Sequence, residues 1–238
     1  NISNIALVLG LTVLLISIPV KQKTIKIDWS VMMIATLLFF IFSLNGHLQQ
    51  WEGIIFVILL VAYILYSLRS SRLEMKGKEK EISDYSTLLY LLIIVISIVG
   101  LLAGSNFLIR SASNIAASWG VSERVISISV IALGTSLPEL ATAVMAARRN
   151  QLDISVGNLI GSNIFNIFGI LGITAIVQDI RIDPETLSFD WYWMAGICLL
   201  LLIFMLPAKK AIIKWWKGII FLLVYFAYYA LVFLKPAI

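Results

Sequence analysis

The chain has 238 residues, of which 61% are hydrophobic and 13% charged, and its mean hydropathy is +0.99. A soluble domain carries about 25% charged residues, so this composition excludes one and indicates a polytopic membrane protein surrounded by lipid. The net charge of +5 does not predict a nucleic-acid partner, because the basic residues are grouped between long apolar stretches.

Eight apolar stretches predict an all-α fold of membrane-spanning helices. They cover residues 1–19, 30–44, 53–68, 86–109, 125–147, 154–178, 191–207 and 216–234. A span needs about 20 residues, so the second and third stretches are expected to recruit flanking residues. The first stretch lacks a basic beginning and a small-residue cleavage site, so we do not expect it to be a removable signal peptide.

Lysine and arginine fall mainly in alternate connections, which predicts the orientation in the membrane. One side holds fourteen of the 18 basic residues: Lys21, Lys23, Lys26, Arg69, Arg72, Lys76, Lys78, Lys80, Arg148, Arg149, Lys209, Lys210, Lys214 and Lys217. The other side holds Arg110, Arg124, Arg181 and Lys235. By the positive-inside rule, the protein is expected in the plasma (inner) membrane, with loop 69–85 cytoplasmic and the C-terminus outside.

The chain contains an internal duplication. NISNIALVLGLT at 1–12 matches NIFNIFGILGIT at 163–174 in seven of twelve positions, at an offset of 162 residues. WEGIIFVILLVAY at 51–63 matches WKGIIFLLVYFAY at 216–228 in seven of thirteen, at an offset of 165. The first offset also carries Asp28 onto Asp190, and both aspartates open spans, where we expect them to cap helix N-termini.

Five spans separate equivalent positions, and because five is odd the two copies must have opposite orientations in the membrane. Inverted repeats of this kind are typical of secondary transporters. Residues 1–68 are assigned to the C-terminal part of the first repeat, 69–85 to a linker and 86–238 to a complete second repeat. The comparison of the copies predicts two further spans upstream of Asn1, for ten spans in all, and that upstream part would supply the other half of any shared site.

Glu139 is the only charged residue at the centre of a predicted span. A carboxylate there costs about 2.5–3.5 kcal/mol on insertion scales, and no span offers a buried basic partner, so its retention indicates a function. Thr135 and Thr142 share its helix face. Pro138 removes a backbone donor and is expected to free the carbonyl of Gly134. Freed carbonyls at membrane depth are tolerated where protein, water or an ion satisfies them.

The following span has a polar stripe of its own. Its members are spaced three, four and four residues apart and so share one face: Ser155, Asn158, Ser162 and Asn166. The two spans thus offer only carboxylate, hydroxyl, amide and carbonyl oxygens, which suit hard cations such as Na⁺ and Ca²⁺. No cysteine or histidine accompanies Glu139, so a hydrolytic constellation is missing and we do not predict an enzyme.

The segments GTSLPEL at 134–140 and GNLIGSNIFNI at 157–167 resemble the paired α-repeat signature of the cation/Ca²⁺ exchanger superfamily, most closely that of prokaryotic Na⁺/Ca²⁺ exchangers. The resemblance implies ten helices in two inverted halves around a central cation site. It also implies these ion ligands: the carbonyl of Ala132, and the side chains of Thr135, Ser136, Glu139, Ser162, Asn166 and Asn4.

The resemblance implies an antiporter that exchanges Ca²⁺ for Na⁺ by alternating access. We expect the protein to work as a monomer. Many relatives carry an aspartate where this chain has Asn166, and the amide lowers the negative charge of the site by one. Proton-coupled Ca²⁺ exchange therefore stays an alternative. A cation channel is a more distant one, because channels usually surround a pore with rings of equivalent residues.

Overall fold

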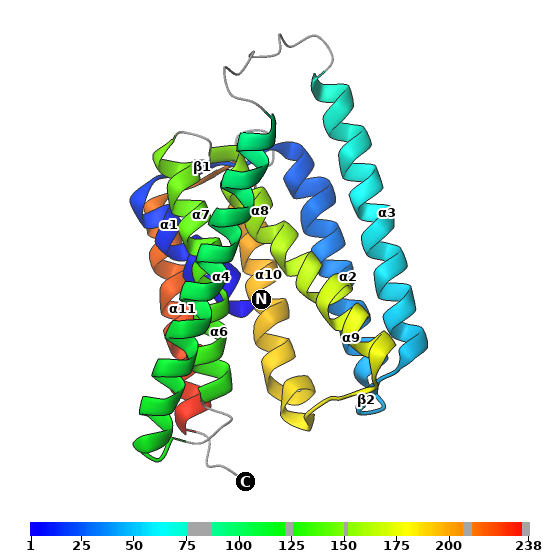
Figure 1. Cartoon of the computed structure of the whole chain (residues 1–238), viewed down its shortest axis with the longest axis vertical. Helices are drawn as coiled ribbons and strands as arrows, with labels where there is room; N and C mark the ends of the chain where they lie inside the picture. Colours follow the sequence, from blue (N-terminus) through cyan, green and yellow to red (C-terminus); the bar gives the residue numbers. More distant parts are fainter. Residues whose placement is uncertain (76–86, 122–125, 150–151, 207–210, 235–238) are drawn as a thin grey trace. The chain divides into compact units, whose positions relative to one another are not determined.

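The structure is a computed structural model and describes residues 1–75, 87–121, 126–149, 152–206 and 211–234 (Figure 1). Seven of its helical segments are long and apolar enough to span a membrane: Thr24–Ser43, Gln50–Ser71, Leu88–Ser118, Ser129–Ala146, Val156–Val177, Thr186–Met205 and Trp215–Leu234. An eighth apolar helix, Ser3–Leu15, is shorter. The predicted all-α polytopic fold is confirmed.

The helices and strands follow one another in the described residues as η1 (Ser3–Leu9), α1 (Gly10–Leu15), β1 (Ile18–Pro19), η2 (Thr24–Asp28), α2 (Trp29–Ser43), β2 (His47–Leu48), α3 (Gln50–Met75), α4 (Thr87–Ser118), η3 (Ser127–Ile131), α6 (Ala132–Thr135), α7 (Leu137–Arg148), α8 (Leu152–Ile164), η4 (Phe165–Leu171), α9 (Gly172–Val177), β3 (Ile180–Arg181), η5 (Thr186–Asp190), α10 (Trp191–Met205), β4 (Ile212–Ile213) and α11 (Trp215–Leu234). The η segments are π-helical turns that continue into, or follow from, α-helices.

Two predicted spans that were short in the sequence are completed by flanking residues. The π-turn η2 adds Thr24–Asp28 before α2, and α3 begins at Gln50, before the apolar run at 53–68. At its other end α3 continues to Met75, so the first part of the predicted linker 69–85 is helical. The rest of that linker, including Lys76, Lys78 and Lys80, lies outside the described residues.

The chain divides into two compact units. The first comprises Asn1–Leu65 and Glu139–Ile238, and the second comprises Tyr66–Pro138. The first unit contains a continuous apolar core whose largest fully buried side chains include Phe56, Phe168 and Phe221. In the second unit, α4 packs against η3 and α6.

The two-residue strands join the repeats to each other. Strand β1 pairs with β4 in antiparallel register, with Ile18 opposite Ile213, and β2 pairs with β3, with Leu48 opposite Ile180. The offset of 162 carries Ile18 onto Ile180, and the offset of 165 carries Leu48 onto Ile213. Exchanging the two copies therefore maps one strand pair onto the other, as expected for inverted repeats related by a two-fold axis.

Two tryptophan side chains form equivalent hydrogen bonds between the two copies. The indole N–H of Trp29 donates to the carbonyl of Cys198 at 2.8 Å, and that of Trp191 donates to the carbonyl of Thr36 at 2.9 Å. Trp29 and Trp191 are equivalent at the offset of 162, and so are Thr36 and Cys198. Each copy therefore binds the other through the same pair of positions, which confirms the predicted inverted duplication.

Glycines allow the backbones of the two copies to approach closely at two helix crossings. A Cβ atom on Gly53 of α3 would lie 2.6 Å from the carbonyl oxygen of Gly172 of α9. A Cβ atom on Gly218 of α11 would lie 2.7 Å from the carbonyl oxygen of Gly10 of α1. The repeat carries Gly10 onto Gly172 and Gly53 onto Gly218, so the two crossings are equivalent. Small residues at such crossings are typical of membrane helix packing.

The predicted capping role of Asp28 and Asp190 is wrong. Neither side chain makes a capping hydrogen bond, because a π-turn precedes each aspartate and leaves no helix start there to cap. Instead, Asp28 Oδ1 accepts a hydrogen bond from the hydroxyl of Tyr63 at 3.0 Å, and Asp190 Oδ1 accepts one from Tyr228, also at 3.0 Å. The aspartates thus tie each π-turn to a later helix of the same copy.

Candidate cation site

The segment before Glu139 is an interrupted helix. The π-turn η3 leads into α6, which ends at Thr135, and α7 begins at Leu137. Pro138 has no N–H, so it cannot donate the usual helical hydrogen bond to the carbonyl of Gly134. The interruption that proline predicts at this point of the span is therefore present.

Three of the predicted ligands meet in the second unit. The hydroxyl of Thr135 donates to the carbonyl oxygen of Ala132 at 3.1 Å, and the hydroxyl of Ser136 donates to the same oxygen at 3.0 Å. Ser136 is buried, whereas Thr135 is exposed. Two hydroxyl oxygens thus lie within hydrogen-bond distance of the same carbonyl oxygen, and all three oxygens keep lone pairs that a cation can use.

Glu139 lies in a second group of ligands, within the first unit. The hydroxyl of Ser162 on α8 donates to Glu139 Oε1 at 2.9 Å, and Asn4 Nδ2 donates to Ser162 Oγ at 3.3 Å. The other carboxylate oxygen, Oε2, is buried and has no hydrogen-bond partner in the described part of the chain. Within those residues no lysine or arginine is bonded to it. A buried carboxylate oxygen without a donor is costly, and a bound cation would satisfy it.

Asn166 belongs to a neighbouring cluster of amides. Its Nδ2 donates to Asn1 Oδ1 at 3.0 Å, and Asn1 Nδ2 donates to the backbone carbonyl of Asn163 at 3.3 Å. Asn163 Nδ2 donates to the carbonyl of Leu159 at 3.0 Å, while its Oδ1 is buried with no partner among the described residues. Sequence reasoning did not select Asn163 as a site residue, although its match with Asn1 in the repeat is a signal that could have found it.

The N-terminal end of the predicted polar stripe does not reach the carboxylate of Glu139. Asn158 Nδ2 lies 3.4 Å from Thr142 Oγ1, and both residues are exposed. The side chain of Ser155 falls outside the described residues. The stripe therefore has two parts, a half-buried one around Ser162 and an exposed contact between α7 and α8 nearer the N-terminus of α8.

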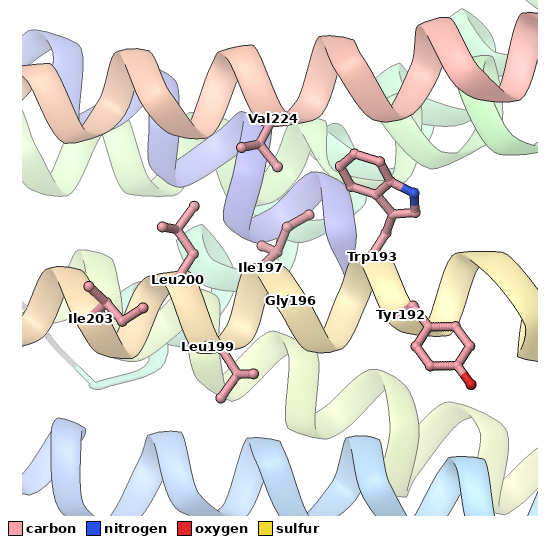
Figure 2. Close-up of a pocket in the computed structure, with 8 residues that line it drawn as sticks. All are labelled: Tyr192, Trp193, Gly196, Ile197, Leu199, Leu200, Ile203 and Val224. Carbon is pink, nitrogen blue, oxygen red and sulfur yellow. The ribbon is translucent and has the colours of Figure 1, made fainter.

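A groove elsewhere in the first unit is not suited to cations. It has a volume of about 480 Å³ and lies on α10, with Val224 of α11 as its far wall. Figure 2 shows Trp193, Ile197 and Leu200 facing Val224, with Tyr192 turned away from it. Its lining is apolar apart from the tips of Tyr192 and Trp193, and therefore lacks the oxygen ligands that Na⁺ or Ca²⁺ requires.

The family described as sodium/calcium exchanger protein matches residues 1–69 and 89–234. The chain belongs to the sodium/calcium exchanger family. It is therefore an integral membrane protein of a transporter family, and not a member of an enzyme family. The predicted family resemblance is confirmed over nearly the whole sequence.

Individual relatives are similar to this chain along most of their length. The sodium/calcium exchanger MaX1 of Methanosarcina acetivorans is 28% identical, with 98% of this chain and 77% of MaX1 covered. The uncharacterized membrane protein MJ0091 of Methanocaldococcus jannaschii is 30% identical, with 94% and 71% covered. A structure of the sodium-calcium exchanger NCX_Mj soaked with 2.5 mM Na⁺ and 10 mM Sr²⁺ aligns with a TM-score of 0.77 and 29% identity, covering 98% of this chain and 74% of that one.

Proposed function

We propose that this chain carries out Ca²⁺/Na⁺ antiport, with Glu139 as the charged ligand of the transported cations. The observation that carries the proposal is the buried Oε2 of Glu139, which has no hydrogen-bond partner among the described residues, while Oε1 accepts a hydrogen bond from Ser162. Family membership and the Na⁺ and Sr²⁺ named for the NCX_Mj structure support these ions as the substrates. Sr²⁺ is a hard divalent cation that prefers oxygen ligands, as Ca²⁺ does.

The remaining predicted ligands supply neutral oxygens. Ser162 donates a hydrogen bond to Glu139, and Asn4 donates one to Ser162. The Ala132 carbonyl and the hydroxyls of Thr135 and Ser136 precede Glu139 by three to seven residues in the chain. Na⁺ and Ca²⁺ compete for these oxygens in our proposal. Occupation by a cation neutralises the carboxylate, so that the loaded protein can interconvert between inward- and outward-open states, whereas the charged empty site cannot cross the low-dielectric barrier.

The amide of Asn166 bears on which ion drives exchange. Its Nδ2 donates to Asn1, so it acts here as a neutral group and adds no charge. An amide at this position, in place of a carboxylate, lowers the negative charge of the site by one, which favours fewer coupling cations per cycle. This observation keeps proton-coupled Ca²⁺ exchange as the second candidate function.

We also propose an orientation from the distribution of basic residues. With the basic connections on the inside, loop 69–85 is cytoplasmic and the C-terminus is outside. The equivalent positions Glu52 and Lys217 fit this arrangement, because the acidic member then lies at the outer end of α3 and the basic member at the inner end of α11. The charge at this position thus changes sign with the orientation of the copy.

The test is Glu139→Gln in proteoliposomes, with Ca²⁺ uptake driven by an imposed Na⁺ gradient. We expect uptake to fall to the level of protein-free vesicles, because the amide keeps the shape of the side chain but not its charge. The matched control is Glu52→Gln, which makes the same chemical change at another buried acid, whose Oε2 accepts a hydrogen bond from the backbone N–H of Gln49 at 2.7 Å.

The outcomes separate the candidate functions. Wild-type uptake that depends on the Na⁺ gradient and is lost only in Glu139→Gln supports the proposal. Uptake driven by a pH gradient alone, without Na⁺, would replace it with proton-coupled exchange. Wild-type rates in Glu139→Gln would rule out Glu139 as the transport ligand.

A further inference from the structure

The carbonyl that Pro138 leaves without its helical donor is occupied by a side chain from another helix. Ser105 of α4 donates its hydroxyl to the carbonyl oxygen of Gly134 at 2.5 Å. Ser105 is only 8% exposed, so water does not replace this hydrogen bond easily. Both residues belong to the second unit.

A second contact fixes α4 at the same residue. Ile109, one helical turn after Ser105, lies so close to Gly134 that a Cβ atom there would be 2.2 Å from Ile109 Cγ1 and 2.9 Å from Cδ1. The hydroxyl of Ser105 and the side chain of Ile109 therefore both contact residue 134, on the same face of α4. Gly134 is buried, and glycine is required there by this close approach.

Gly134 stands between the residues that carry three of the proposed ligands. Ala132 precedes it and offers its carbonyl, and Thr135 and Ser136 follow it and donate their hydroxyls to that carbonyl. Because α6 has only four residues and ends at Thr135, the helix itself does little to fix their orientation. A hydrogen bond to the middle of the segment fixes the backbone on which all three ligands depend.

We propose that Ser105 is a positioning residue for cation binding. It acts through the carbonyl of Gly134, which it holds against α4, and so sets the geometry of the Ala132 carbonyl and of the Thr135 and Ser136 hydroxyls. This inference rests on the proposed function, since it assigns Ser105 to the same ligands. It adds a residue of α4 that does not itself contact the ion.

The test compares Ser105→Ala with Ser113→Ala in the reconstituted protein. Ser113 lies two turns further along α4, and its buried hydroxyl has no hydrogen-bond partner in the described residues, so the same chemical change there removes no bond. We expect Ser105→Ala to raise the Ca²⁺ concentration for half-maximal exchange about fivefold, the factor expected for loss of one neutral hydrogen bond. Ser113→Ala should leave this Ca²⁺ concentration unchanged. Ser105→Thr keeps a hydroxyl, so its half-maximal Ca²⁺ concentration should be close to that of the wild type.

A second measurement does not depend on transport. Hydrogen–deuterium exchange of the peptide covering 131–140 in nanodiscs should be faster in Ser105→Ala than in wild type or Ser113→Ala. Should Ser105→Ala not purify as a monodisperse protein, Ser105→Cys, with its weaker donor, takes its place.

Equal rates of hydrogen–deuterium exchange in this peptide, together with equal half-maximal Ca²⁺ concentrations for the two alanine variants, would overturn the role of Ser105. If the wild type did not transport Ca²⁺ at all, the proposed function would fail. The deuterium exchange would then still show whether Ser105 fixes the 132–136 backbone, and equal exchange would overturn the inference on its own.

Discussion

Ser162 is the residue on which the Glu139 group depends. Its hydroxyl donates to one oxygen of the carboxylate and accepts from the amide of Asn4, which belongs to the other copy of the repeat. A serine hydroxyl has one donor and two acceptor positions, so after these two bonds one lone pair remains for a cation. Ser162 can therefore orient the charged ligand and serve as a ligand itself.

Replacing Ser162 with alanine should weaken Ca²⁺ binding strongly. A hydrogen bond to a charged group is worth about 1.5–3 kcal/mol, so we expect the half-maximal Ca²⁺ concentration to rise at least about tenfold. The measurement is Ca²⁺ titration of Na⁺-driven uptake in proteoliposomes. Ser30→Ala is the control, because that hydroxyl donates only to the carbonyl of Lys26 in its own helix. An unchanged titration curve for Ser162→Ala would contradict the role of Ser162 in orienting Glu139 and binding the cation.

The residues around Ser162 show which features of the site could be predicted from the sequence alone. Glu139 could be selected because a single acid in an apolar span has a large cost, and Ser162 because spacing puts it on one face with other polar residues. The free oxygen of Glu139 and the amide contacts of Asn163 could not be predicted. They depend on which rotamers the packing of α8 against the other copy allows, and spacing along one helix does not contain that information.

At the scale of elements, interruptions and close crossings are the main features. Proline predicted the interruption before α7, but no signal in the sequence predicted the π-turns η2 and η5, which extend two spans and remove the capping role of Asp28 and Asp190. The glycine crossings likewise depend on two distant segments meeting. Gly53 alone predicts only a lower helix propensity, whereas Gly53 beside Gly172 allows two helix backbones to come into contact.

The crossing of α3 and α9 predicts a severe effect for Gly53→Ala. The new Cβ atom would lie 2.6 Å from a backbone carbonyl oxygen, which cannot move aside as the end of a side chain can. We expect the free energy of unfolding to fall by about 1–3 kcal/mol, as for overpacking in a core. Thermal unfolding in detergent measures it, with Gly196→Ala on α10 as control.

Gly196 has open space where its Cβ atom would be, so alanine there should be neutral or slightly stabilising through better helix propensity. Gly218→Ala, at the equivalent crossing of α11 and α1, should behave like Gly53→Ala, since its Cβ atom would lie 2.7 Å from the carbonyl oxygen of Gly10. If Gly53→Ala melted with the wild type, the two backbones would not be in contact at this crossing.

At the scale of the whole molecule, the main feature is the set of contacts between the two copies within the first unit. Strand pairs, glycine crossings and tryptophan hydrogen bonds all join a position of one copy to a position of the other, and each contact has its equivalent under exchange of the copies. The repeat could be read from the sequence because polar and aromatic residues recur at fixed offsets. The contacts between the copies could not be predicted from the sequence, since a repeat shows which residues are equivalent but not which ones touch.

The tryptophan pair makes these contacts testable. Trp29→Phe and Trp191→Phe each remove one hydrogen bond between the copies, so each should lower the free energy of unfolding by about 1 kcal/mol. Trp191→Phe should cost more, because the ring of Trp191 also packs on Phe40 with centroids 4.2 Å apart. Trp51→Phe is the control, since that indole is exposed and donates only to Gln49, two residues away. Thermal unfolding in detergent ranks the three variants. If Trp29→Phe and Trp191→Phe melted at the temperature of Trp51→Phe, the indole bonds would not hold the copies together, and the strands and glycine crossings alone would have to do so.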